Sequence, residues 1–181
     1  MNAVQPALFL DRDGVINVER AYVHRREEFD FIDGIFDLCR HARRQGFLLF
    51  VVTNQAGIAR GYYSEDEFLA LTQWMRSRFA DEGAPLDEVY YCPYHAEHGL
   101  GRYKIDSPMR KPAPGMILKA ATDFAVDLPG SVLVGDMETD IQAGVAAGVG
   151  VNLLYRPSEA AAPGRITRLI DASDFLVLRE P

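Results

Sequence analysis

The chain has 181 residues, of which 48% are apolar and 25% charged, and its formal net charge is −7. These values are typical of a soluble domain that buries its own core, and the acidic balance argues against a nucleic-acid-binding surface. The sequence has no run of about 18 apolar residues, so it predicts no membrane span, and the N-terminus has no signal-peptide pattern. Two cysteines, Cys39 and Cys92, make no disulfide framework, so we expect a cytoplasmic protein.

Strand and helix patterns alternate along the whole chain, which predicts an α/β fold with a parallel sheet. Apolar runs predict strands at residues 7–11, 47–52, 89–92, 131–134 and 149–154. Apolar residues at helical spacing predict helices at residues 34–45, 64–81, 114–124 and 138–147, the second opened by a capping box at Ser64 and Glu67. Residues 93–109 show no periodicity, and residues 158–164 have the composition of a connector. Residues 166–178 are predicted to form a short helix and an edge element.

The first predicted strand ends on two acidic residues, Asp11 and Asp13, followed by Gly14. Because side chains alternate along an extended chain, both carboxylates are expected to face one point, at the sheet edge where open α/β folds bind ligands. Two such carboxylates repel each other unless a cation lies between them or one holds a proton. The pair matches a Mg²⁺ site, a nucleophile with an acid–base partner, or a simple polar turn.

Three further segments carry polar side chains at equivalent places in the pattern. The Thr-Asn-Gln sequence at 53–55 follows the second strand, and it could bind phosphate oxygens or form a polar turn. Arg110 and Lys111 precede a helix that starts near a proline, where the helix N-terminus also attracts anions, although they could equally be a surface basic pair. Asp136 follows the fourth strand, one helical turn before Asp140, and matches either a metal ligand or a helix cap.

The order and spacing of these four motifs resemble the haloacid dehalogenase superfamily of phosphohydrolases, over residues 8–154. The resemblance implies a Rossmann-like three-layer sandwich with a central parallel sheet, and a Mg²⁺-dependent phosphatase. Residues 14–34 are too few for a folded cap, and core elements fill most of residues 53–111. We therefore expect residues 1–181 to form a single capless domain, a monomer, with the loop 93–109 over the site.

The resemblance also implies a role for each motif residue. Asp11 would attack phosphorus and form an aspartyl-phosphate, and Asp13 would protonate the leaving alkoxide and then activate water. Thr53 and Lys111 would bind the other phosphoryl oxygens. The groups implied to hold Mg²⁺ are the side chains of Asp11 and Asp136 and the backbone carbonyl of Asp13, with Asp140 in support.

Longer sequence motifs, such as Asp-Arg-Asp-Gly at 11–14 and Thr-Asn-Gln-Ala-Gly at 53–57, resemble those of one branch of this superfamily. That branch contains heptose 1,7-bisphosphate and histidinol-phosphate phosphatases. Its heptose members remove the C7 phosphate of D-glycero-D-manno-heptose 1,7-bisphosphate on the route to lipopolysaccharide core, and this is the expected function. The residues implied to contact a small phosphorylated sugar are Arg12, Glu19, Arg20, Tyr22, Asn54, Gln55 and Arg110.

Three alternatives stay open at this point. Histidinol-phosphate phosphatase shares the mechanism, but Arg110 would be a poor partner for a cationic substrate. A DNA 3′-phosphatase shares part of the Thr-Asn-Gln motif, yet this acidic chain has no basic groove. An inactive phosphate-binding scaffold would be expected to have lost at least one motif residue.

The sequence departs from the branch in two places. The branch usually holds the loop after the third strand with a structural zinc, but Tyr94, Ser107 and Met109 stand where three of the four ligands would be. Methionine and serine are poor zinc ligands, so no structural zinc is expected. Met137 stands where relatives often have a lysine that reaches the substrate, which makes the affinity for a bisphosphate less certain.

Overall fold

The computed structural model describes residues 4–177, so Leu178, the last residue of the predicted C-terminal element, lies outside the described part. Its centre is a sheet of six parallel strands in the order β3-β2-β1-β4-β5-β6, which confirms the predicted α/β fold. The strands are β1 (Ala7–Leu10), β2 (Leu48–Asn54), β3 (Glu88–Cys92), β4 (Val132–Gly135), β5 (Val151–Tyr155) and β6 (Arg165–Ile166).

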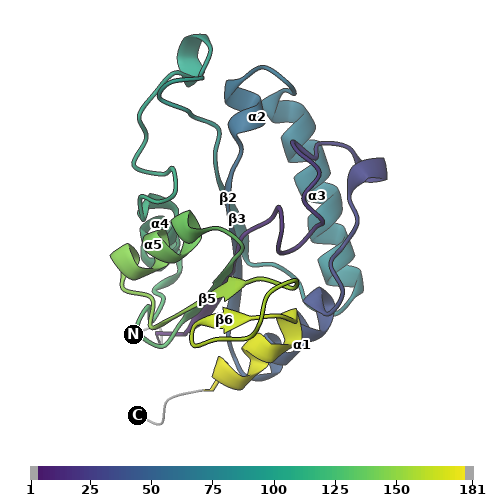
Figure 1. Cartoon of the computed structure of the whole chain (residues 1–181), viewed down its shortest axis with the longest axis vertical. Helices are drawn as coiled ribbons and strands as arrows, with labels where there is room; N and C mark the ends of the chain where they lie inside the picture. The colour runs from purple at the N-terminus through teal and green to yellow at the C-terminus, as the bar shows by residue number, and fades with distance from the viewer. Residues whose placement is uncertain (1–3, 178–181) are drawn as a thin grey trace.

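Helices cover both faces of the sheet, which gives the three layers expected from the sequence (Figure 1). α1 (Ile35–Arg44) and α3 (Glu65–Asp81) pack on one face, and α4 (Gly115–Phe124) and α5 (Glu138–Ala147) on the other. The capping box at Ser64 and Glu67 opens α3 as predicted. Short elements complete the fold: α2 (Ala56–Ala59) and the 3₁₀ turns η1 (Arg26–Glu28), η2 (Gly101–Tyr103) and η3 (Leu169–Phe175).

Of these short elements, α2 was not predicted, because one helical turn is too short to produce a periodic pattern of apolar residues. Near the C-terminus, the edge strand β6 (Arg165–Ile166) and the 3₁₀ helix η3 (Leu169–Phe175) agree with the predicted edge element and short helix. In residues 4–177, no helix has the length and apolar character needed to cross a membrane.

The strand β1 lies in the middle of the sheet and is buried on both sides. Leu8 and Leu10 join the core beneath α1 and α3, whereas Ala7 and Phe9 join the core beneath α4 and α5. This double burial explains why the strand reads as a continuous apolar run and not as an alternating one. It also holds the backbone that leads into residue 11 rigidly in place.

The carboxyl ends of β1, β2 and β4 meet where the strand order reverses. β1 lies between β2 and β4: the chain passes from β1 to β2 and β3 on one side, and then crosses to β4, β5 and β6 on the other side. The amide of Asp11 continues the β1–β4 pairing by donating to the carbonyl oxygen of Val134 at 3.1 Å. Open α/β folds bind ligands in the crevice at such a point.

Candidate active site

A cavity of about 590 Å³ lies at this crevice and collects the predicted site residues from across the sequence. Asp11 and Asp13 follow β1, Thr53 is the second-last residue of β2, and Asp136 follows β4. The other residues that line it include Glu19, Ala21, Tyr22, Asn54, Gln55, Tyr63, Arg110, Lys111, Met137, Thr139 and Asp140.

Lys111 is the buried cation at the floor of the cavity. Its Nζ atom lies 2.8 Å from Asp11 Oδ1 and 2.6 Å from Asp140 Oδ1, and it donates to the carbonyl oxygen of Val52 at 2.7 Å. Burial alone would lower its pKa, but Asp11 and Asp140 outweigh burial and raise the pKa above its ordinary value. Lys111 is therefore charged at neutral pH.

The backbone of Lys111 is held as firmly as its side chain. Asn54 donates from Nδ2 to the Lys111 carbonyl and accepts the Lys111 amide at Oδ1, both at 3.0 Å. The side-chain amide of Asn54 makes the same pair of hydrogen bonds that the backbone of a neighbouring strand would make. Asn54, predicted to contact substrate, thus also joins the end of β2 to the segment that carries the lysine.

Three carboxylates gather beside Lys111: one oxygen each of Asp11, Asp136 and Asp140 lies within 4.8 Å of the others. Burial raises the pKa of Asp11 to about 8 and that of Asp136 to about 6, and the nearby Asp140 raises both further. One lysine does not balance this much buried negative charge. A divalent cation would, and carboxylate oxygens are donors that suit Mg²⁺.

The three carboxylates are not equally free to bind that cation. Both oxygens of Asp140 are already engaged, one by Lys111 and the other by the amide of Met137 at 2.9 Å. Asp11 uses Oδ1 for Lys111 and for the amide of Arg12, and among residues 4–177 no hydrogen bond engages its Oδ2 atom. Asp11 and Asp136 therefore fit a metal better than Asp140, which holds Lys111 in place.

Gly14 allows Asp136 to approach the turn after β1. Its φ of +85° is in the left-handed region that favours glycine. A Cβ at this position would lie 2.2 Å from Asp136 Oδ2, a distance that atoms do not tolerate. The glycine in the Asp-x-Asp-Gly motif is thus needed for contact between two strand ends as well as for the turn.

Asp13 is held by donors from several directions. The side chains of Arg12, Asn17 and Gln55 donate to its two oxygens at 2.7–3.2 Å. In this arrangement Asp13 accepts hydrogen bonds, as a carboxylate does. These donors fix the Asp13 carboxyl group in the cavity beside Asp11.

Two residues predicted to contact substrate, Arg12 and Arg20, do not line the cavity. Arg12 is 1% exposed and lies behind Asp13, between the rings of Phe29 and Phe68, where it also donates to the carbonyl oxygen of Val23. It positions Asp13 and does not line the cavity. Arg20 points outward to an exposed ion pair with Asp30.

The segment between Arg12 and η1 nevertheless reaches the cavity through its other residues. Glu19, Ala21 and Tyr22 line the cavity, and Ala21 and Tyr22 have φ angles of +53° and +66°. Non-glycine residues in this region are strained and are held there by their surroundings. The Tyr22 ring packs edge-on against Tyr62 at 4.7 Å between centroids.

Tyr63 lines the cavity but was not predicted. It is 5% exposed, stacks on His24, and donates from its hydroxyl to Gln55 Oε1 at 2.5 Å. It comes from the connection between α2 and α3, and a lone aromatic residue in a connection gives no pattern that sequence reasoning could use. Only the structure shows that it meets Gln55.

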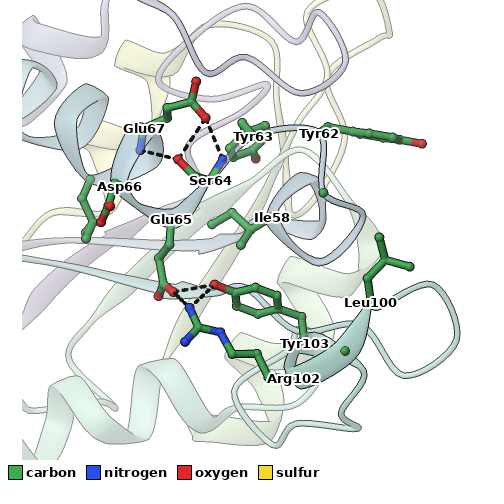
Figure 2. Close-up of a pocket in the computed structure, with 13 residues that line it drawn as sticks. Ile58, Tyr62, Tyr63, Ser64, Glu65, Asp66, Glu67, Leu100, Arg102 and Tyr103 are labelled. Atoms are coloured by element: carbon green, nitrogen blue, oxygen red, sulfur yellow. Dashed lines mark hydrogen bonds and ion pairs between the residues drawn. The ribbon is translucent and has the colours of Figure 1, made fainter.

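The loop 93–109 contributes less to this cavity than expected. Of the segment after β3, only Arg110 and Lys111 line the cavity, and Arg110 donates to the carbonyl oxygen of Tyr94 at 3.3 Å. The loop instead lines a neighbouring open hollow of about 750 Å³ with the start of α3 (Figure 2). The mouth of the cavity is accordingly open.

The geometry predicts that Lys111→Met destabilises the protein. Without the lysine, Asp11 and Asp140 would be buried with no cation between them, which typically costs about 3–5 kcal/mol. Urea unfolding in the presence of EDTA measures the change. The control is Lys119→Met, which removes an exposed lysine paired with Asp123 and should change the free energy of unfolding by less than about 1 kcal/mol. Equal effects of the two variants would contradict the structural role of Lys111.

Comparison with known proteins identifies relatives of this chain. The HAD-hydrolase-like family model matches residues 108–166. The D-glycero-alpha-D-manno-heptose-1,7-bisphosphate 7-phosphatase of Burkholderia mallei is 61% identical over 155 residues, 86% of this chain and 82% of the relative. The corresponding beta-anomer phosphatase of Vibrio cholerae is 53% identical over 152 residues, 84% of this chain and 82% of the relative.

A solved structure of D,D-heptose 1,7-bisphosphate phosphatase from B. bronchiseptica, in complex with magnesium and phosphate, has the same fold. It superimposes with a TM-score of 0.81 at 26% identity and covers 95% of this chain and 98% of its own. With these relatives, the chain belongs to the heptose 1,7-bisphosphate 7-phosphatase family of the haloacid dehalogenase superfamily.

Proposed function

We propose that the chain removes the C7 phosphate of D-glycero-D-manno-heptose 1,7-bisphosphate through an aspartyl-phosphate on Asp11, on the route to the heptose of lipopolysaccharide core. The observation that carries this proposal is the meeting of Asp11, Lys111 and Asp136 in one cavity. The names of the relatives from B. mallei and V. cholerae support the substrate. Those two names differ in the anomer, so the proposal covers both anomers.

In the first step, the free oxygen of Asp11 attacks phosphorus. A bond forms between Asp11 and phosphorus as the bond from phosphorus to the C7 oxygen breaks, and Asp13 gives a proton to that leaving oxygen. In the second step, Asp13 takes a proton from water and the water oxygen bonds to phosphorus, while the bond between the Asp11 oxygen and phosphorus breaks. This step regenerates the Asp11 carboxylate and releases inorganic phosphate.

Lys111 and Thr53 bind the remaining phosphoryl oxygens during both steps. Phosphoryl transfer depends mainly on positioning and on neutralising the charge of these oxygens. Asp11, Asp136 and the backbone carbonyl of Asp13 would hold Mg²⁺, which supplies further positive charge to the phosphoryl group when bound. Lys111 already lies at Asp11 and so is placed to meet the same group.

The second phosphate and the sugar lie toward the mouth of the cavity. Arg110 is the cation available there, and its guanidinium matches the geometry of a phosphate. Glu19 and Tyr22 line the same cavity and are placed to contact the sugar hydroxyl groups. Met137 is 54% exposed beside them and adds no charge, so Arg110 carries the contact with the second phosphate.

We further propose a single capless domain over residues 1–181, acting as a monomer in the cytoplasm without a structural zinc. The open mouth of the cavity supports the absence of a cap. For zinc, His95 Nδ1 accepts the amides of Glu97 and His98, which engages one of the ring nitrogens that could bind a metal. The remaining sulfur atom nearby, that of Cys92, is buried.

A substrate panel tests the function. Heptose 1,7-bisphosphate should be the best substrate with Mg²⁺, and EDTA should abolish the release of inorganic phosphate. Asp11→Asn should lower kcat by about 10³-fold or more, because an amide cannot form the covalent intermediate, whereas Asp123→Asn on the surface should not. Better turnover of histidinol phosphate or of a 3′-phosphorylated oligonucleotide would contradict the substrate, and an active Asp11→Asn would contradict the mechanism.

Metal analysis of the purified protein tests the absence of zinc. We expect well under one zinc per chain after purification without added metal, since serine and methionine replace thiolate ligands. The opposite result would be zinc close to one per chain, with a loop 93–109 that becomes disordered when the zinc is removed. That result would show that Cys92 and the histidines do bind zinc.

Tyr63→Phe should lower kcat by about three- to tenfold, the value of one neutral hydrogen bond. The Tyr63 hydroxyl fixes the Gln55 oxygen, so the Gln55 nitrogen donates to Asp13 and to Thr53. Without the hydroxyl, the amide can flip and present an acceptor to Asp13. The matched control is Tyr90→Phe, which removes a hydroxyl bonded to Asp123 and should leave kcat unchanged.

A double-mutant cycle separates this role from a loss of packing. In a Gln55→Ala background, Tyr63→Phe should have no further effect, since the group that it orients is gone. Additive losses would mean that Tyr63 acts in another way.

A further inference from the structure

The carboxylate of Glu65 binds three side chains that approach it from the segment after α3. The Tyr91 hydroxyl donates to Oε1 at 2.7 Å. The Tyr103 hydroxyl donates to Oε2 at 2.9 Å, and Arg102 lies 3.7 Å from Oε2 (Figure 2). Glu65 is the first residue of α3, where the capped helix end keeps its backbone fixed. Hydrogen bonds to an ionised carboxylate are stronger than those between neutral groups.

The loop 93–109 depends on such polar anchors. It extends away from the sheet and includes η2 (Figure 1), and its apolar residues Leu100 and Ile105 are 61% and 45% exposed. Tyr94 and Met109 at the ends of the loop pack against the core beneath α4 and α5, and Tyr103 packs against the cluster of Ile58, Tyr63 and Phe68, whereas the rest of the loop tip has little apolar burial. Tyr103 ties it to α3 through Glu65, and the amide of Leu100 ties it to the carbonyl oxygen of Ala59 at 2.9 Å.

Inside the loop, contacts continue from Tyr103 to the cavity. The carbonyl oxygen of Tyr103 accepts the amide of His95 at 3.1 Å, and the rings of Tyr94 and Tyr103 lie 6.2 Å apart. The carbonyl oxygen of Tyr94 then accepts a hydrogen bond from Arg110 at 3.3 Å. A continuous path of contacts thus runs from Glu65 to Arg110.

Lys111, the next residue, does not share this dependence. Asn54 pairs with its backbone, and Asp11 and Asp140 hold its ammonium group. A loose loop would therefore release Arg110 while Lys111 stayed in place. The two neighbouring cations are held by separate parts of the protein.

We propose that Glu65 is a positioning residue that fixes Arg110, through Tyr103 and Tyr94, for the second phosphate of the substrate. The proposal rests on the proposed function, in which Arg110 meets that phosphate. It assigns to Glu65 an effect on binding of the bisphosphate and none on phosphoryl transfer, because among residues 4–177 no hydrogen bond or ion pair joins Glu65 to Asp11, Asp13 or Lys111.

Kinetics with two substrates test the proposal. Glu65→Ala should raise the KM for heptose 1,7-bisphosphate about tenfold, since two charge-assisted hydrogen bonds are lost, and leave kcat within about twofold of the wild type. With p-nitrophenyl phosphate, which has no second phosphate, both constants should stay unchanged. Tyr103→Phe should shift the same KM in the same direction by a smaller factor.

The matched control is Asp66→Asn, which removes one negative charge from the same first turn of α3. Asp66 is exposed and points away from Tyr103 (Figure 2), so this variant should behave as the wild type with both substrates. Equal losses with both substrates in Glu65→Ala would show a general structural role and overturn the proposal. An unchanged KM for the bisphosphate would overturn it as well.

Hydrogen–deuterium exchange separates failure of the anchor from failure of the proposed function. Amides of residues 94–105 should exchange faster in Glu65→Ala than in the wild type or in Asp66→Asn. If exchange does not change, Glu65 does not anchor the loop and the proposal is wrong. If exchange rises but the wild-type protein does not cleave the bisphosphate, Glu65 does anchor the loop, but the proposed function is wrong. The predicted effect on the KM for the bisphosphate is then wrong as well.

Discussion

The burial of Lys111 between Asp11 and Asp140 is the interaction on which the site depends. A charged lysine with a 3% exposed side chain is tolerated only because two carboxylates and a carbonyl oxygen surround it. Each partner comes from a different part of the sheet: Asp11 follows β1, Val52 belongs to β2, and Asp140 lies in α5 beyond β4. The ion pair therefore joins the three strand ends and sets where the phosphoryl group can lie.

Most of the fold, and the residues at the strand ends, could be predicted from the sequence because both follow from local pattern. A doubly buried strand must be apolar throughout, so the run that ends at Leu10 shows where the chain leaves the sheet. Parallel strands then bring their ends together, which places Asp11, Thr53 and Asp136 in one crevice. The place of Lys111 just before a helix also fits a surface basic pair, and the resemblance to the superfamily was needed to predict its role.

The residues that support the site could not be predicted, because their roles depend on contacts between distant segments. In the sequence, Arg12 is a cation next to a predicted catalytic acid, which suggested a contact with the substrate. Only its burial between Phe29 and Phe68 shows that it faces the core. Tyr63 and Glu65 belong to no motif, although each makes hydrogen bonds that fix a neighbouring functional group. Side-chain direction decides such cases, and the linear pattern does not contain it.

The central position of β1 also has a consequence for how the protein is made. The amide of Ala7 donates to Ser131 Oγ across 124 residues of sequence, and β1 pairs with β4 over the same span. Contacts of such long range form late and slow the folding of a chain. On the ribosome, the N-terminal strand can pair with β2 early, but it must wait for β4 with one edge open. Asp11 and Asp13, the first residues of the site to be synthesised, are thus among the last to reach their final surroundings. Until then the unpaired edge of β1 in the nascent chain can pair with a wrong strand.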